Sequence, residues 1–285
     1  MTSLKRMIAN EEFVLAPGAY DCLTAGAVQR AGFNAVYMTG AGVSASHGYP
    51  DFGLLTMTEM VTVAGRMAAS VDVPLIADAD SGFGSELNTA RAVRAYERAG
   101  VAAIQIEDQT FPKKCGHFEN KSIVPADDYI AKIRAACKAR ESADLLIIAR
   151  TDARAVEGFE VAIERGKRAA DAGADIVFVE APQTLGEMAA IPERIDVPCL
   201  LNVVWRGKTP DIGFKDAAEM GYKIVILPSI LLKSVMGVSI EVLNLAKANG
   251  RHPVPPGDLS IKEGAALAAG AEWRSINGAL DTPLA

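Results

Sequence analysis

The chain has 285 residues, with 35 acidic against 29 basic side chains, a formal net charge of −6 and 50% hydrophobic residues. This acidic balance argues against nucleic acid or an anionic membrane as the main partner and favours a small-molecule ligand. No apolar run reaches the roughly 18 residues of a membrane span, and the N-terminal segment lacks the apolar centre of a secretory signal. We therefore expect a cytoplasmic protein that does not contact a membrane.

The four cysteines are widely spaced and form no Cys-x-x-Cys pair. This spacing predicts neither a disulfide framework nor a zinc knuckle. Any chemistry that involves a thiol must therefore come from a single cysteine and its surroundings.

One unit recurs along the chain, a helical segment that ends in Ala-Gly or Met-Gly and runs directly into an apolar strand. The glycine is typical of a helix C-terminus, and the β-branched run after it is typical of a strand buried on both faces of a parallel sheet. Amphipathic helices are predicted between most of the apolar runs. Eight such runs occur in chain order, at residues 13–17, 35–39, 74–79, 102–107, 145–151, 176–180, 199–203 and 223–227.

Eight strands that alternate with helices predict a (β/α)8 TIM-type barrel rather than an open doubly wound sheet. No linker or low-complexity segment interrupts the chain. We assign residues 1–285 to one domain, with the barrel at about 13–250. Additional C-terminal helices, at about 251–285, are expected to pack on the barrel or on a neighbouring subunit.

Polar side chains follow six of the predicted strands. In a barrel of this type the carboxyl ends of the strands gather at one mouth, where the chemistry is located. These residues are Thr39 and Gly40 at the second strand, Asp78 and Asp80 at the third, Glu107 and Asp108 at the fourth, Arg150 and Asp152 at the fifth, Glu180 at the sixth and Asn202 at the seventh.

Three of these residues are carboxylates on two adjacent strands. Asp78 and Asp80 alternate and lie on one side of their strand, and Glu107 is expected to face them. Clustered carboxylates repel one another unless a cation lies among them, and oxygen ligands without His or Cys favour Mg2+ over Zn2+. The alternative is that the acids cap helices or pair with a lysine.

Arg150 ends the fifth strand, where its guanidinium is suited to a two-pronged hydrogen-bonded pair with a substrate carboxylate. The alternative is a salt bridge to Glu180 or Asp152 that only stabilises the barrel mouth. Position alone does not separate these interpretations.

The stretch TFPKKCGHFENKSIVP, residues 110–125, follows the fourth strand and has neither helical nor strand periodicity. A loop of this length in a compact domain is typical of a functional lid. Lys113, Lys114 and His117 are expected to favour the thiolate of Cys115, which makes it a candidate acid/base group. The alternative is a bystander thiol in a loop.

Seven motifs occur in an order and spacing similar to the isocitrate lyase and phosphoenolpyruvate mutase superfamily: YMTGAG, YPDFGLLT, DADSGFG, IEDQ, PKKCGH, ARTDA and FVEAP. The resemblance extends from about Leu15 to Pro228, and KKCGH resembles the catalytic loop of the carbon–carbon lyases in that superfamily. The pattern is most similar to 2-methylisocitrate lyases and 2,3-dimethylmalate or 2-alkylmalate lyases. It implies cleavage of a 2-hydroxy dicarboxylate, by a retro-Claisen or aldol-type route, to pyruvate and a second carboxylate.

The resemblance also implies a role for each matching residue. The implied metal residues are Asp78, Asp80 and Glu107, with Asp51 nearby, holding Mg2+ largely through water, with Mn2+ as the alternative ion. The implied residues around the pyruvate half are Tyr37, Thr39, Gly40 and Ala41, with Arg150 on its carboxylate and with Glu180, Asn202 and Gly116 completing the pocket. The implied catalytic residues are Cys115 as general acid, His117, Lys113 and Lys114 in the same loop, and Tyr37 or a bound water as the base.

One departure bears on the substrate. After the seventh strand the chain reads NVVWRG, so Val204 and Trp205 stand where methylisocitrate lyases carry a hydroxyl and a carboxylate residue. The extra carboxylate of a tricarboxylate would be poorly paired there, which favours a 2-alkylmalate such as 2,3-dimethylmalate. Arg206 would reverse that preference if it faced the pocket. The alternative activities are oxaloacetate hydrolysis to oxalate and acetate and, more weakly, a phosphonopyruvate mutase reaction, and the family likeness implies a homotetramer with exchanged helices.

Overall fold

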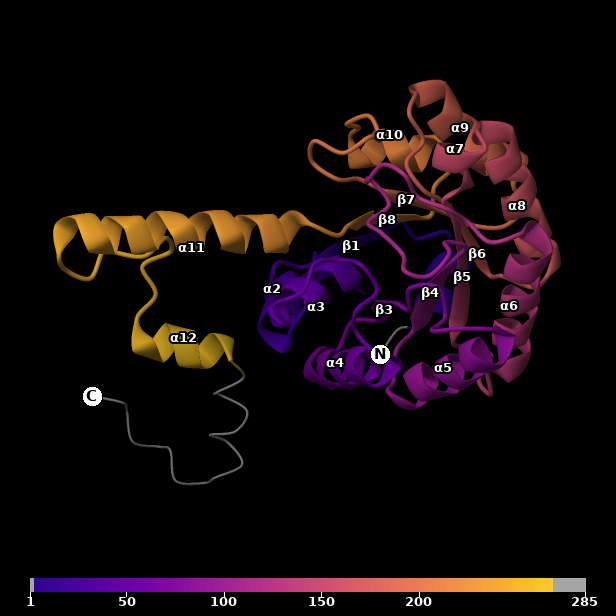
Figure 1. Cartoon of the computed structure of the whole chain (residues 1–285). Helices are drawn as coiled ribbons and strands as arrows, with labels where there is room; N and C mark the ends of the chain where they lie inside the picture. Colours follow the sequence, from indigo (N-terminus) through magenta and orange to yellow (C-terminus); the bar gives the residue numbers. More distant parts are fainter. Residues whose placement is uncertain (1–2, 269–285) are drawn as a thin grey trace. The chain divides into compact units, whose positions relative to one another are not determined.

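A computed structural model describes residues 3–268 of the chain. Its eight strands form a closed parallel barrel in chain order, with β1 paired to both β2 and β8 (Figure 1). The strands are β1 (Val14–Ala19), β2 (Val36–Met38), β3 (Leu75–Asp78), β4 (Ala103–Glu107), β5 (Leu146–Thr151), β6 (Ile176–Val179), β7 (Cys199–Asn202) and β8 (Ile224–Leu227). The predicted (β/α)8 barrel and all eight predicted strands are therefore confirmed.

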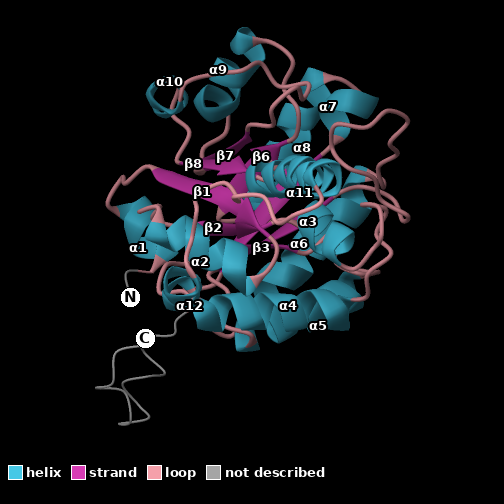
Figure 2. Ribbon diagram, turned by 90° about the vertical axis from the view of Figure 1, so that its left-hand side faces the viewer, coloured by secondary structure: helices cyan, strands magenta, loops and turns pink. Residues whose placement is uncertain are grey.

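Helices surround the strands, as Figure 2 shows for the barrel. The helices are α1 (Leu4–Ala9), α2 (Cys22–Arg30), α3 (Gly40–Ser46), α4 (Met57–Ser70), α5 (Glu86–Arg98), α6 (Ala126–Ala139), α7 (Ala153–Val156), α8 (Phe159–Asp171), α9 (Leu185–Arg194), α10 (Phe214–Glu219), α11 (Ile230–Asn249) and α12 (Ile261–Leu267). Strand β2 ends earlier than predicted because Thr39 is the N-cap of α3, where its side chain accepts a hydrogen bond from the Gly42 amide.

The core has two layers because each strand is buried on both faces. Side chains that point inward, such as Ile148, Phe178 and Ile226, fill the barrel. Side chains that point outward, such as Val177 and Leu201, pack against the surrounding helices. Each fully buried aliphatic side chain contributes about 1.5–3 kcal/mol, so this double burial holds the strand ends at the mouth in fixed positions.

The chain divides into two compact units, Met1–Leu231 and Leu232–Ala285. The first unit contains the barrel, and the second contains most of α11 together with α12. No residue of α11 is buried. The predicted assignment of the whole chain to one domain stays a prediction, and residues 269–285 of the predicted extension lie outside the described residues.

No helix in residues 3–268 is both long enough and apolar enough to cross a membrane.

Candidate active site

The barrel brings the predicted polar residues together at the carboxyl ends of its strands. Strand register places Asp78 beside Gln105 and Glu107 beside Arg150. Asp80 lies two residues after the end of β3, in the left-handed region with φ 46°, where the chain turns into the next loop. These side chains are buried beneath the loops of the mouth, so their charges interact strongly.

The three predicted metal carboxylates interact with one another. Burial and the nearby Asp80 raise the pKa of Asp78 to about 6. Burial also raises the pKa of Glu107 well above its usual range, although Arg150 opposes this shift. The Asp78 carboxylate is held in place by hydrogen bonds from the amides of Gly40 and Asp80. Both raised pKa values show that burial and mutual repulsion disfavour the ionised carboxylates here, a cost that a nearby cation relieves.

Lys113 lies between two of the acids. Its ammonium contacts Asp51 and is 2.7 Å from Asp80 Oδ1, with only 4% of its side chain exposed. Burial lowers the pKa of Lys113, but Asp80 and Asp51 raise it more, so the net shift is well above the usual range. The alternative considered from sequence, in which an acid pairs with a lysine, thus describes Asp80 and Asp51 in this structure.

The carboxylates also fit a divalent cation. The buried Oε1 of Glu107 accepts no hydrogen bond, and neither does the buried Oδ1 of Asp80, although the Lys113 ammonium lies 2.7 Å from it. In the described residues, no three His, Cys, Asp or Glu side chains converge to enclose an ion by themselves. An ion held here would therefore take most of its ligands from water and substrate, which is the usual coordination of Mg2+.

Arg150 is bound by carboxylates on three sides. Its Nε and Nη2 donate to Asp152 at 2.9 and 3.1 Å, and its Nη1 lies 3.2 Å from Glu107. Nη2 is also 3.4 Å from Glu180, and the guanidinium carbon is 5.3 Å from the centre of the Phe178 ring. The salt bridges considered from sequence are present, and they orient the guanidinium at the centre of the mouth.

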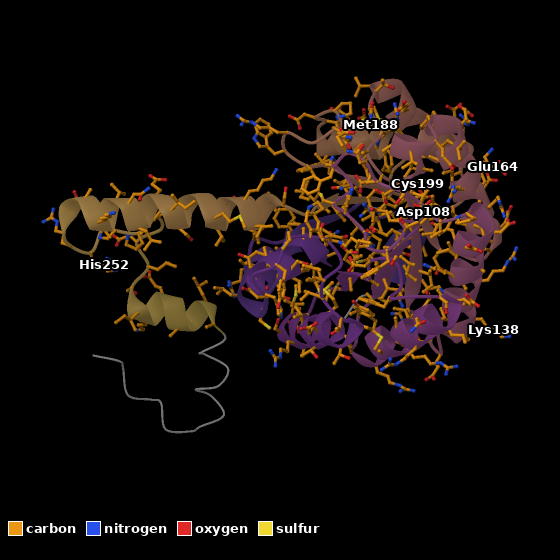
Figure 3. All side chains as sticks on the ribbon, viewed as in Figure 1. Asp108, Lys138, Glu164, Met188, Cys199 and His252 are labelled. Atoms are coloured by element: carbon orange, nitrogen blue, oxygen red, sulfur yellow. The ribbon has the colours of Figure 1, made fainter. Side chains whose placement is uncertain are left out.

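A second layer of polar residues supports this arrangement. Asp108 accepts hydrogen bonds from the Asp152 amide, from Thr151 Oγ1 and from Arg165, and it lies within the ring of helices in Figure 3. Gln105 accepts a hydrogen bond from the Tyr37 hydroxyl at 3.1 Å. Sequence reasoning gave Gln105 no role, although a glutamine inside the apolar run AIQIE was a usable signal.

Residues 110–124 form a loop, here called the gate, that contains neither helix nor strand. Its two ends are joined by a bridge between Gln109 and Ile123 and by a hydrogen bond from the Thr110 amide to the Ser122 carbonyl. Gly116, near the middle of the gate, packs so closely on Arg150 that an added Cβ would lie 2.5 Å from Nη2. The gate therefore covers the carboxylate cluster.

His117 connects the gate to the loop after β7. Its Nδ1 accepts a hydrogen bond from the Lys208 amide at 3.1 Å, and its Nε2 lies 3.4 Å from Glu180. Asn202 donates to Glu180, while the buried Oδ1 of Asn202 accepts no hydrogen bond. Burial lowers the pKa of His117, which favours the neutral imidazole in this contact.

The expectation that nearby cations stabilise a Cys115 thiolate is wrong. Burial raises the pKa of Cys115, and the carboxylates of Asp51 and Glu180 add to the shift. Lys113 is directed to Asp51 and Asp80, and Lys114 donates to the Asn120 carbonyl. Cys115 is therefore a protonated thiol, the form required of a general acid.

The residues expected around the pyruvate half lie at the ends of β2 and α3. Gly40 approaches Asp78 so closely that an added Cβ would lie 2.6 Å from Oδ2, and Ala41 is the next residue of α3. Burial raises the pKa of Tyr37 well above its usual range, with a further contribution from Asp78. Such a phenol keeps its proton, which argues against Tyr37 as the base.

Arg206 lies in the loop after β7. Its side chain is exposed, with φ 59°, and Trp205 is 66% exposed. Val204, next to them, is half-buried. Arg206 is therefore not one of the buried residues of the mouth.

Comparison with known proteins supplies the family. A family model described as phosphoenolpyruvate phosphomutase matches residues 4–245. The chain is 48% identical over 227 residues to a 2,3-dimethylmalate lyase of Eubacterium barkeri, covering 79% of this chain and 78% of the other. It is 45% identical over 240 residues to a 2-methylisocitrate lyase of Aeropyrum pernix, covering 84% and 77%.

Solved structures agree with these relatives. A crystal structure of 2,3-dimethylmalate lyase, a PEP mutase/isocitrate lyase superfamily member, matches with a TM-score of 0.95, 35% identity and coverage of 100% and 99%. An oxaloacetate acetylhydrolase in complex with the inhibitor 3,3-difluorooxalacetate matches with a TM-score of 0.93 and 34% sequence identity. The match covers 99% of this chain and 97% of the other. A phosphonopyruvate hydrolase in complex with oxalate and Mg2+ matches with a TM-score of 0.87 and 30% sequence identity, and the match covers 98% of each chain.

Proposed function

Because the chain belongs to the PEP mutase/isocitrate lyase superfamily, we propose that it is a carbon–carbon lyase that cleaves a 2-hydroxy dicarboxylate to pyruvate and a second carboxylate. The observation that carries this proposal is the contact of the gate with Arg150 and Glu180 at the barrel mouth. Gly116 packs on Arg150 and Glu180, which brings the neighbouring Cys115 over the mouth as a protonated thiol. The named lyases among the relatives support the same reaction class.

The reaction breaks the C2–C3 bond of the substrate. The C2 hydroxyl loses its proton and becomes the carbonyl of pyruvate, while the bonding electrons pass to C3, beside the second carboxylate. Cys115 delivers a proton from sulfur to C3 and is reprotonated from solvent after the products leave. A bound water is the proposed base, because Tyr37 keeps its proton.

The residues around the substrate divide the work between its two halves. Arg150, oriented by Asp152, binds a carboxylate through its guanidinium. The amide of Asn202 and the Gly116 backbone complete the other side of the pocket. The free Oδ1 of Asn202 is available to a donor group of the ligand or its hydration water.

We assign the cation to Mg2+, with Mn2+ as the alternative, held by Asp80, Asp78 and Glu107 largely through water, with Asp51 nearby. The buried Glu107 Oε1, which accepts no hydrogen bond, supports the assignment. The similarity to the phosphonopyruvate hydrolase solved in complex with oxalate and Mg2+ supports it as well. A divalent ion bound here stabilises negative charge that develops on the substrate oxygens.

The preferred substrate is a 2-alkylmalate such as 2,3-dimethylmalate. The Val204 side chain supplies no hydrogen-bond donor to a third carboxylate, and Arg206 is exposed. A buried, unpaired carboxylate costs several kcal/mol. The similarity to the 2,3-dimethylmalate lyase of Eubacterium barkeri supports this choice.

We also infer a homotetramer with exchanged C-terminal helices. The large apolar side chains of α11, among them Ile240 and Leu243, are 62% and 68% exposed, which supports an interface on this helix. The cytoplasmic location stays a prediction from the sequence.

A substrate panel tests the proposal. Purified protein with Mg2+ is incubated with 2,3-dimethylmalate, other 2-alkylmalates, 2-methylisocitrate, oxaloacetate and phosphonopyruvate, and the products are identified by mass spectrometry. Pyruvate from an alkylmalate supports the lyase. Oxalate and acetate from oxaloacetate alone would instead assign the hydrolase activity, which the similarity to oxaloacetate acetylhydrolase keeps as the second candidate.

A further inference from the structure

Lys121 is a buried lysine of the gate that takes no part in the proposed chemistry. Only 1% of its side chain is exposed. Its ammonium donates to Asp152 Oδ1 at 2.6 Å and to the Gly116 carbonyl. An ammonium is costly to bury unless it is paired with a carboxylate and its remaining donors are hydrogen-bonded. These two partners therefore account for its stability in this position.

The partners of Lys121 belong to different parts of the site. Its neighbours Ser122 and Ile123 pair with Thr110 and Gln109 at the base of the gate, so the Lys121 backbone is fixed there. Gly116 lies at the middle of the gate, two residues beyond Lys114, whose backbone is hydrogen-bonded to the Gln109 side chain. The side chain thus extends from the fixed base to the part of the loop that covers the mouth.

Asp152 links this lysine to Arg150, the residue proposed to bind the substrate carboxylate. Its carboxylate is shared between Arg150 and Lys121. Although burial opposes ionisation, these two cations lower the pKa of Asp152 to about 2. Gly116 in turn packs on Arg150. These four residues therefore contact one another in sequence: Arg150 with Asp152, Asp152 with Lys121, Lys121 with Gly116, and Gly116 with Arg150.

We propose that Lys121 is a positioning residue that holds the gate closed, so that Cys115 reaches its working position only when Arg150 and Asp152 are paired. Lys121 acts through Gly116 and Asp152, the two acceptors of its hydrogen bonds, and not on the reacting atoms themselves. The effect on turnover rests on the proposed function. The effect on gate position does not.

The test measures the gate directly through the rate at which iodoacetamide alkylates Cys115, read by peptide mass spectrometry without substrate. The exposed Cys22 and the buried Cys199 report reagent quality and global unfolding in the same sample. Lys121→Met removes the charge and keeps an unbranched side chain, and Lys138→Met, on the exposed outer side of α6, is the matched control (Figure 3).

We expect Lys121→Met to raise the alkylation rate of Cys115 about tenfold or more, because a charge-assisted hydrogen bond to the gate is lost. The rates of Cys22 and Cys199 and every rate in Lys138→Met should equal those of the wild type. With the best substrate of the panel, kcat should fall about tenfold and KM should change less. Lys121→Arg should restore part of both effects.

A Cys115 rate in Lys121→Met equal to the wild-type rate overturns the proposal, as does a lowered melting temperature with unchanged kcat and alkylation, which would indicate a purely structural ion pair. If Lys121→Met does not fold, Lys121→Gln takes its place with the same expected results. If the wild-type protein cleaves none of the substrates, the proposed function fails while the alkylation measurement still decides the role of Lys121.

Discussion

Arg150 donates hydrogen bonds through Nε and Nη2 to the two carboxylate oxygens of Asp152, two residues later in the chain, at 2.9 and 3.1 Å. This pair fixes the plane of the guanidinium before any substrate arrives. Its Nη1 lies beside Glu107, one of the three clustered carboxylates. The mouth is thus preorganised by the protein, which reduces the cost of ordering it during the reaction.

Replacement of Arg150 by lysine should keep the charge and lose the two-pronged geometry. We expect kcat/KM to fall about 100-fold or more, because a single ammonium cannot bind Asp152 and a substrate carboxylate in the same plane. Steady-state kinetics together with a thermal melt measure this effect. An unchanged kcat/KM would show that Arg150 only stabilises the mouth.

Replacement of Cys115 by serine should lower kcat by about 10²- to 10⁴-fold, the usual contribution of a general acid, with a smaller change in KM. The hydroxyl is nearly isosteric with the thiol but holds its proton more tightly. Full turnover of every active substrate by Cys115→Ser would remove the acid assignment.

The alkylation of Cys115 should also depend on pH in a predictable way. Its pKa is raised by burial, so the reactive thiolate forms only above the pKa of an ordinary thiol, about 8.5. The rate against pH, followed by peptide mass spectrometry, should therefore rise later for Cys115 than for a small-molecule thiol. A rise that begins near neutral pH would restore the thiolate interpretation.

Replacement of Gly116 by alanine should prevent the gate from closing. The added Cβ would lie 2.5 Å from Arg150 Nη2 and 2.6 Å from the Glu180 carboxyl carbon, both held by ion pairs. We expect kcat to fall at least about tenfold, because the added methyl group would hold the gate away from these two side chains. Gly186→Ala on α9, where an added Cβ meets only Thr184 Oγ1 at 3.8 Å, is the control and should keep full activity.

Removal of metal by EDTA should abolish turnover, and Mg2+ or Mn2+ should restore it. Asp80→Asn should weaken Mg2+ binding about tenfold or more, measured by calorimetry on the metal-free protein, because one negative charge of the carboxylate cluster is lost. Equal binding by Asp80→Asn and the wild type would mean that Asp80 serves only Lys113.

Much of this molecule can be predicted from its sequence for a local physical reason. A parallel strand buried on both faces requires a short continuous apolar run, so each of the eight strands is visible in isolation. Once the barrel is inferred, its topology alone requires the residues after β3, β4 and β5 to meet at one mouth. The position of the carboxylate cluster and of Arg150 at the mouth could therefore be predicted from the sequence alone.

Only the tertiary structure decides which partner each charge takes and how deeply it is buried. Lys113 and Cys115 are neighbours in sequence, yet the lysine is directed to Asp51 and Asp80 while the thiol is buried and keeps its proton. Lys121 pairs with Asp152, the residue that follows β5, 31 positions away. Desolvation and ion pairing depend on distances between segments far apart in the chain, and a linear pattern of residues does not contain those distances.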